Sequence, residues 1–177
     1  MVGKVELREP QSMEHAKPDK RLDWEDRWST PSLDQLMEPF QEDQRALVNS
    51  LIERIRLYDG VTECYKWYGA AWKWTVQFDI QDQNRKHLDT LAFLVPDPAC
   101  PLVCIPLTEP ALNQLPMRRL SKFIREGIRG AKRAVDVYWA YWQPSNQTEI
   151  DGLLDLAKRK HKILLAKVIG TPPAAAR

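Results

Sequence analysis

Strict alternation runs through Trp72-Lys73-Trp74-Thr75-Val76-Gln77-Phe78-Asp79-Ile80. Every second residue in this segment is apolar, and the residues between them are polar or charged. Successive side chains of a β-strand point to opposite faces of a sheet. The segment therefore predicts a half-buried strand, and its core face would consist of Trp72, Trp74, Val76, Phe78 and Ile80.

Four further strands are predicted around this one. Residues 61–67 alternate before a tight turn at 68–71, residues 90–95 and 102–107 flank a Pro-Asp-Pro turn, and residues 135–142 form the fifth strand. Because proline cannot donate a backbone hydrogen bond, Pro101 and Pro106 favour an edge position for the strand at 102–107.

Apolar residues recur at helical spacing before and after these strands. They predict a short helix from Ser32, a first long helix at 42–58, a basic helix at 117–132 and a final helix after Pro144. The order α-β-β-β-β-α-β-α describes an α+β fold, a curved antiparallel sheet of about five strands with helices packed on one face.

The ends of the chain differ in composition from its centre. Residues 1–31 are polar, charged and interrupted by prolines, which predicts a flexible, acidic arm. Within it, Trp24 and Trp28 are four residues apart and would dock on the domain if they shared a helical face. We expect a single α+β domain at 32–168 and a disordered tail at 169–177.

Net charge is distributed unevenly along the chain. Residues 1–115 contain 13 Lys+Arg and 19 Asp+Glu, a balance of −6, whereas residues 116–177 contain 13 and 5, a balance of +8. A basic half is typical of a nucleic-acid or membrane surface. It is equally explained by neutralisation against the acidic half, or by solvated helix faces.

Aromatic and turn residues also give the chain a family resemblance. It rests on Trp67-Tyr68-Gly69, Trp72-Lys73-Trp74-Thr75 and Leu94-Val95-Pro96-Asp97-Pro98, then a basic helix, a strand with Trp139 and Trp142, and a Lys158-Arg159-Lys160 helix. This pattern resembles small bacterial domains of unknown function with YdhG-like architecture, over about residues 33–165. The resemblance implies a curved sheet carrying helices and a cytoplasmic location, and it transfers no activity and no catalytic residue.

Two tryptophan-rich clusters are the candidate binding site. Trp and Tyr suit cores, interfaces and ligand pockets alike, because they combine a large apolar area with a polar group. The leading hypothesis is a binding module with an aromatic-lined cleft for a small ligand or a partner's side chain. The cleft would be lined by Tyr65, Trp67, Tyr68, Trp72, Trp74, Trp139 and Trp142, with Arg118 and Lys122 as anchors for an anionic group. The alternative is that these rings are core.

Glu63 is the candidate for an enzymatic function. Alternation places its carboxyl on the same side as Tyr65 and Trp67, and an aromatic setting would raise its pKa towards that of a general acid or base. The alternatives are that Glu63 meets solvent near the start of its strand, or that it pairs with an arginine.

The basic helix suggests a third function. Arg118, Lys122, Arg125, Arg129 and Lys132 would form one continuous stripe, which could contact phosphates of a nucleic acid while nearby rings stack on bases. The strand aromatics, however, alternate as core residues do, which argues against an open stacking platform.

Other site chemistry is not indicated. The chain has neither a glycine-rich phosphate loop nor histidines or cysteines at metal-ligand spacing, so we expect no cofactor and no metal. Cys64, Cys100 and Cys104 are odd in number and predict reduced, mostly buried thiols in a cytoplasmic protein. No apolar run approaches the length of a membrane span and no secretory signal is recognised, so we expect no membrane partner.

Overall fold

The computed structural model describes residues 22–169, and side chains up to residue 166. Six strands form one antiparallel sheet in the order β1-β2-β3-β4-β6-β5. The predicted α+β class with an antiparallel sheet and helices is confirmed. The strands are β1 (Val61–Trp67), β2 (Trp74–Gln81), β3 (His87–Val95), β4 (Leu102–Thr108), β5 (Lys132–Ala134) and β6 (Val137–Trp142).

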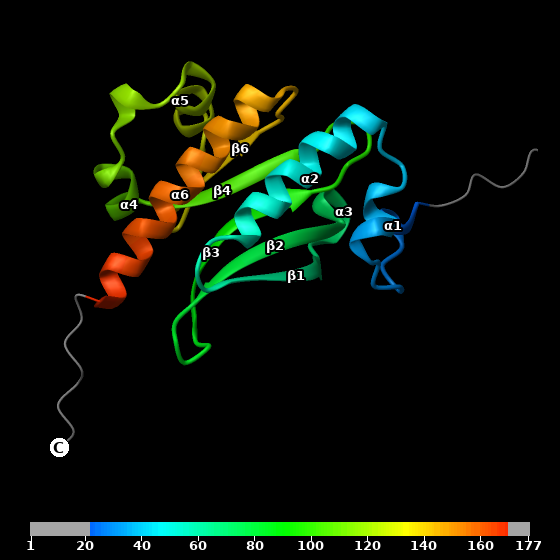
Figure 1. Ribbon diagram of the computed structural model, residues 1–177, viewed down its shortest axis with the longest axis horizontal. Coiled ribbons are helices and arrows are strands. Elements are labelled where there is room, and N and C mark those ends of the chain that lie inside the picture. Colours follow the sequence, from blue (N-terminus) through cyan, green and yellow to red (C-terminus); the bar gives the residue numbers. More distant parts are fainter. Residues whose placement is uncertain (1–21, 170–177) are drawn as a thin grey trace, which may run out of the picture.

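The helices lie mainly on one side of this sheet. Figure 1 shows α2 and α6 crossing the same face side by side, with α5 near the end of α6 that follows β6. The helical segments are η1 (Asp23–Glu25), α1 (Leu33–Met37), α2 (Glu42–Arg56), α3 (Gly69–Trp72), α4 (Glu109–Gln114), η2 (Met117–Arg119), α5 (Lys122–Arg129) and α6 (Gln147–Ile169). We call the sheet face beneath α2, α5 and α6 the helix face, and the opposite one the open face.

The core lies between the helix face and α2 and α6. Val76, Phe78 and Ile80 of β2 are fully buried there, in one cluster with Leu51 of α2 and Leu153 of α6. Burying a side chain of this size stabilises a fold by roughly 1.5–3 kcal/mol. The expected inward face of the 72–80 segment is therefore correct from Trp74 onward.

Trp72 is the exception, because the β1–β2 connection is longer than a tight turn. Residues 69–72 form the single-turn helix α3, and Gly69 and Lys73 at its two ends have positive φ angles of 77° and 49°. The Tyr68 amide donates to the Lys73 carbonyl oxygen over 2.8 Å and closes the connection. Strand β2 begins only at Trp74. The prediction that Trp72 shares the core face is wrong.

The basic segment is not one helix. It contains the short turn η2, then α5, and then strand β5. Helix α5 begins after Ser121, whose hydroxyl caps it by accepting a hydrogen bond from the Ile124 amide. Arg118 and Lys132 therefore lie outside the helix, and the predicted continuous stripe is wrong. Because β5 and β6 form a hairpin, turning where Val135 has a φ of 56°, the sheet has six strands.

Strand β4 is interior, so its predicted edge position is also wrong. It lies between β3 and β6. Its register with β3 ends at Cys104, whereas its register with β6 continues to Thr108. Pro106 is tolerated because it lies beyond the ladder with β3, and Pro101 precedes the strand.

The chain before α1 is partly packed on the domain. Trp24 in η1 is 6% exposed and belongs to the core, whereas Trp28 is 85% exposed. The two rings do not share a helical face, since η1 ends at Glu25, and only Trp24 docks. The remainder of the predicted arm, residues 1–21, and residues 170–177 of the predicted tail lie outside the described residues.

Candidate functional site

The predicted binding residues separate onto the two faces of the sheet. Register places Trp67 opposite Trp74 and Tyr65 opposite Val76, so Tyr65 and Trp67 belong to the helix face. Trp74 is 7% exposed, and its indole Nε1 donates to the Asp26 carbonyl oxygen over 2.6 Å. These three aromatic residues are therefore part of the core or packed against it.

Trp142 is also a core residue. It is 3% exposed, and its Nε1 donates to the Phe123 carbonyl oxygen of α5 over 3.2 Å. A Cβ placed on Gly127 of α5 would lie 2.1 Å from that same nitrogen. Such close approach of helix and indole leaves no space for a ligand beside Trp142.

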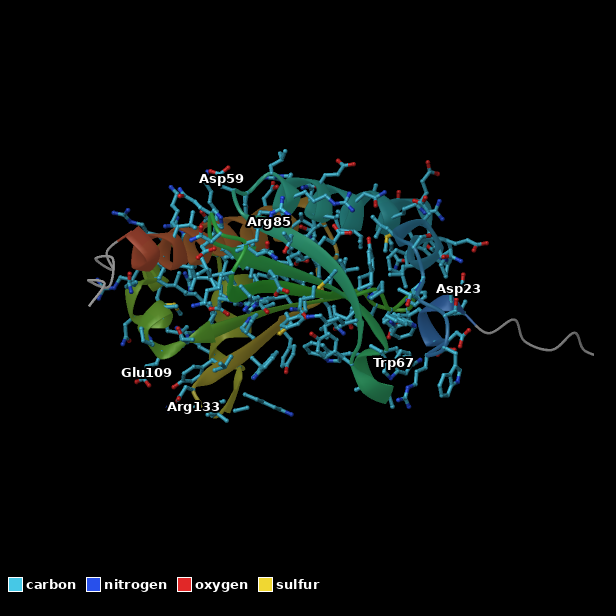
Figure 2. All side chains as sticks on the ribbon, turned by 90° about the horizontal axis from the view of Figure 1, so that it is seen from below. Asp23, Asp59, Trp67, Arg85, Glu109 and Arg133 are labelled. Atoms are coloured by element: carbon cyan, nitrogen blue, oxygen red, sulfur yellow. The ribbon has the colours of Figure 1, made fainter. Side chains whose placement is uncertain are left out.

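The remaining predicted aromatics meet on the open face. Trp72 of α3 contacts Trp139 and Tyr141 of β6, with ring centroids 6.1 Å apart in both pairs. Tyr68 and Phe93 complete the group, since Phe93 lies 5.4 Å from Trp72, 5.5 Å from Tyr68 and 5.8 Å from Trp139. We call these five residues the open-face cluster. Figure 2 shows the turn next to Trp67 and the hairpin that carries Arg133 projecting from the same side of the sheet.

Exposure varies within this cluster. Phe93 is 4% exposed and forms its floor together with the fully buried Cys104, whereas Tyr68 is 39% exposed and Trp72, Trp139 and Tyr141 are half-buried. The rings of these last four residues thus cover the sheet and still reach solvent. The long helices α2 and α6 lie on the opposite, helix face.

A polar network adjoins the cluster and is centred on Asp79. Its Oδ1 accepts from Gln77 Nε2 over 2.6 Å and from Thr90 Oγ1 over 2.7 Å, and His87 Nε2 lies 3.3 Å away. Tyr68 connects the two groups, because its hydroxyl donates to Gln77 Oε1. Sequence alternation placed Gln77 and Asp79 on the face opposite the core, but gave no sign that both would be buried.

Hydrogen bonds and burial act in opposite directions on the ionisation of Asp79. Burial disfavours its charge, but the hydrogen bonds from Gln77 and Thr90, and then His87, outweigh that effect and lower the pKa of Asp79. Burial also raises the pKa of the neighbouring Cys64 thiol, whose Sγ is 3.9 Å from Asp79 Oδ2. Asp79 therefore remains ionised at neutral pH, and Cys64 remains a thiol.

Glu63 pairs with an arginine, which is one of the two alternatives to a catalytic role. Its Oε2 accepts from Arg56 Nε over 2.7 Å and its Oε1 from Arg56 Nη2 over 2.9 Å, while the Tyr65 hydroxyl donates to Oε1. Burial opposes ionisation, but these hydrogen bonds hold the pKa of Glu63 below its ordinary value. The expected rise in its pKa is wrong.

Arg118 and Lys122 lie apart from the aromatic rings. Lys122 is an exposed residue of α5 whose Nζ is 3.7 Å from Glu126 Oε1. Arg118 lines a shallow hollow with Met117, Arg125 and Arg129. This hollow contains no aromatic side chain, so the structure does not combine the predicted anion anchors with the predicted ring platform.

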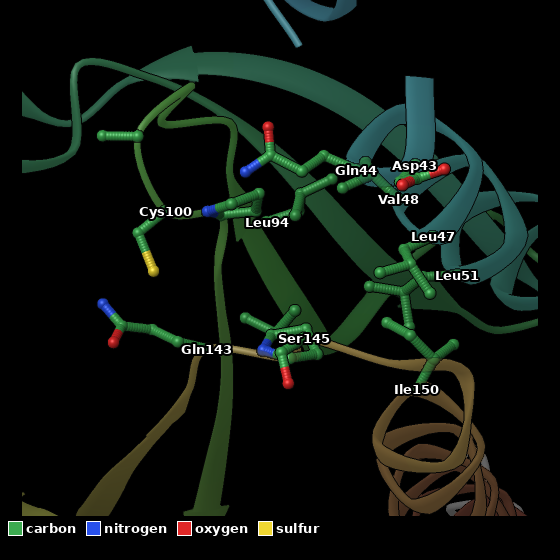
Figure 3. A pocket seen from close by; sticks show the side chains of 14 residues that line it. Asp43, Gln44, Leu47, Val48, Leu51, Leu94, Cys100, Gln143, Ser145 and Ile150 are labelled. Atoms are coloured by element: carbon green, nitrogen blue, oxygen red, sulfur yellow. The ribbon is translucent and has the colours of Figure 1, made fainter. Parts of the chain in front are cut away.

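An apolar cavity of about 230 Å³ on the helix side was not anticipated from the sequence. Figure 3 shows it between the start of α2, the loop at Cys100 and the segment from Gln143 to Ser145. Its walls include Leu47, Leu51 and Ile150. Cys100 is the exposed thiol, Cys64 is half-buried and Cys104 is buried, and all three are free.

Neither a metal-binding cluster nor a membrane-spanning helix occurs in residues 22–169. Residues 22–169 contain no group of three or more His, Cys, Asp or Glu arranged to hold a metal ion. None of the helices in that range is long and apolar enough to cross a membrane.

Comparison of the chain with protein-family models, with curated proteins and with solved structures gives no match. The YdhG-like resemblance therefore stays a prediction.

Proposed function

We propose that this protein is a binding module whose ligand surface is the open face of the sheet, and that the ligand carries a flat ring. One observation carries this proposal: the half-buried ring of Trp72 in α3 contacts those of Trp139 and Tyr141 in β6. The contact lies on the sheet face opposite the long helices. Contiguous apolar surface that remains accessible is typical of ligand and partner sites.

The geometry of the cluster favours a ring-shaped ligand. Rings pack on aromatic side chains by offset stacking or edge-to-face contact, each worth about 0.5–1.5 kcal/mol beyond the buried area. The Asp79 network beside Tyr68 supplies polar atoms at one side of the rings, and polar groups beside an apolar surface fix a ligand's orientation.

The enzymatic alternative has less support. Glu63, its candidate acid or base, has a lowered pKa and is fully engaged by Arg56 and Tyr65 on the helix face. Cys64 lacks the lowered pKa of a nucleophilic thiol. We also infer a cytoplasmic location, because the three free cysteines suit a reducing compartment.

Ligand-stabilised thermal unfolding tests the proposal. We expect at least one member of a panel of nucleosides, aromatic amino acids and sugars to raise the midpoint, because a ligand that binds only the folded state adds about 2.7 kcal/mol at a hundred times its Kd. Trp139→Leu should abolish that rise. Trp28→Leu is the matched control, since Trp28 is an exposed tryptophan outside the open face.

The control also defines the outcome that contradicts the proposal. A stabilising compound that acts equally on wild type, Trp28→Leu and Trp139→Leu binds elsewhere, and the open-face cluster is then a second core layer. The same conclusion follows if neither a compound of the panel nor a single-stranded oligonucleotide binds through Trp139.

A further inference from the structure

We infer that the ligand of the open face is a single-stranded nucleic acid, whose bases stack on Tyr68, Trp72, Trp139 and Tyr141 while lysines around them contact the phosphates. This inference rests on the proposed function. It differs from nucleic-acid binding through the basic helix, because it uses the sheet.

The exposed rings suit bases because none is enclosed between parallel neighbours. The interplanar angles are 62° for Tyr68 with Trp72, 68° for Trp72 with Trp139 and 87° for Trp72 with Tyr141. Aromatic side chains presented by an antiparallel sheet stack two or three bases in proteins that read single strands. Base–aromatic stacking is tolerant of sequence because every base has a π-face.

Charge on the open face complements a phosphate backbone. Register places Lys66 and Lys132 on this face, and Lys132 lies directly opposite Trp139. Asp79 is the one carboxylate at the open-face positions of the six strands, and its side chain is 11% exposed. Its carboxylate accepts hydrogen bonds from Gln77 and Thr90, and the Lys66 ammonium group, 4.0 Å from Oδ2, offsets its negative charge.

The two lysines are also accessible. The Lys66 side chain is 50% exposed, and its Nζ lies 4.0 Å from Asp79 Oδ2. Lys132 is exposed, and its ammonium group pairs with no carboxylate among residues 22–166. An unpaired lysine beside a tryptophan places a phosphate contact next to a stacking contact.

The arginine hollow of η2 and α5 is the competing location. Arg118 and Arg129 are exposed there and would also attract phosphates. Since no ring lines the hollow, it would bind single and double strands by charge alone. The two locations therefore differ in their preference for unpaired bases.

The test uses fluorescence anisotropy of labelled 12-nucleotide oligo(U) and oligo(dT), with a 12-base-pair DNA duplex for comparison, on the full chain. We expect both single strands to bind more tightly than the duplex. Trp139→Leu should weaken binding about 5- to 150-fold, which corresponds to the loss of one stacked base. Trp139→Phe should retain most of the affinity, and Trp28→Leu all of it.

Lys132→Glu provides a second variant that does not depend on core packing, because residue 132 is exposed on the edge strand. It should weaken single-strand binding and reduce the slope of log K against log salt by about 0.7, the value for one lost phosphate contact. Circular dichroism confirms that each variant is folded before its affinity is interpreted.

Two results overturn the inference. If Arg118→Glu with Arg129→Glu abolishes binding while Trp139→Leu and Lys132→Glu do not, the nucleic acid lies on the arginine hollow. If no oligonucleotide binds but a small compound stabilises the protein through Trp139, the open face is a site for another ligand, and only the proposed function survives.

Discussion

Lys160 of α6 donates through Nζ to the carbonyl oxygen of Thr90 in β3, with the carbonyl oxygen of Leu91 at 3.4 Å. The contact lies at a β-bulge, since Phe78 pairs with Ala92 while Asp79 pairs with Thr90. Leu91 is thus the extra residue. An ammonium group on the helix face therefore holds the bulge that brings Thr90 Oγ1 within 2.7 Å of Asp79 on the open face.

Lys160 should make stability depend on pH in an unusual direction. Burial lowers its pKa to about 8, although Asp89 and Cys104 partly oppose this. Between pH 8 and about 10.4, the ordinary value, the unfolded chain binds the proton and the folded protein releases it. The free energy of unfolding contributed by Lys160 therefore rises with pH across this window.

Comparison with Lys160→Met isolates this effect from the tyrosines that also titrate at high pH. The wild-type free energy of unfolding minus that of the variant should increase between pH 8 and pH 10. The increase is at most about 1.4 kcal/mol for each unit by which the folded-state pKa of Lys160 lies below its ordinary value. Urea unfolding at pH 7, 8, 9 and 10 measures it. A difference that stays constant or falls would show that the ammonium group is not desolvated.

The Arg56–Glu63 pair should contribute stability that acid removes. Glu63→Gln removes the charge from a carboxylate that is 13% exposed and accepts three hydrogen bonds, so we expect a loss of about 1–2 kcal/mol at pH 7. Because the folded-state pKa of Glu63 is lowered, its contribution is present above about pH 4.3 and is lost as pH falls through that folded pKa.

Chemical unfolding of wild type and Glu63→Gln at pH 7 and pH 3 checks this expectation. Glu53→Gln is the matched control, since Glu53 is an exposed residue of α2, the helix that carries Arg56, and its effect should stay within about 0.5 kcal/mol. Equal effects of the two substitutions at pH 7 would mean that the pair with Arg56 is not a stabilising contact.

Local pattern predicted the helix face well and the open face poorly. The period-2 alternation of Val76, Phe78 and Ile80 is enforced by burial, so it can be read from the sequence. Trp72 could not be placed in this way, because α3 shifts the phase of the chain at Gly69 and Lys73. A non-glycine residue with positive φ such as Lys73 has no reliable sequence signature.

The open-face cluster depends on pairings that are distant in the sequence. Phe93 of β3 contacts Trp139 of β6 because only β4 lies between the two strands in the sheet. This strand order cannot be derived from the sequence of either strand alone. The broken basic helix did leave a signal. Gly130 follows α5 directly, and a glycine there is a common stop for a helix, but the regular spacing of the arginines favoured a longer helix.

Gly127 within α5 and Gly130 directly after it should respond differently to substitution by alanine. In Gly127→Ala the new Cβ would lie 2.1 Å from Trp142 Nε1, so the indole must move and weaken its hydrogen bond to Phe123. We expect a loss of about 1–3 kcal/mol, as for overpacked cores. Gly130→Ala is the control, because its nearest contact is 3.4 Å and its φ is −80°.

Thermal unfolding and near-UV circular dichroism measure both variants. Gly130→Ala should be neutral, or stabilising by about 0.4–1 kcal/mol, because alanine restricts the unfolded chain. If Gly127→Ala proved as mild as Gly130→Ala, Trp142 would have room to move, and its assignment to the core rather than to a pocket would be wrong.

The three cysteines should react with an alkylating reagent in a fixed order. Cys100 is exposed at the rim of the apolar cavity, Cys64 is half-buried beside Asp79, and Cys104 is buried beneath the open-face cluster. Burial raises the pKa of Cys104 to about 12 and also raises that of Cys64, and only a thiolate reacts.

Iodoacetamide at pH 8, followed by peptide mass spectrometry, should therefore modify Cys100 first and Cys104 only on unfolding. Cys100→Ser should remove the fast phase alone. Rapid labelling of Cys104 in the folded protein would show that Phe93, Trp139 and Tyr141 do not close over it.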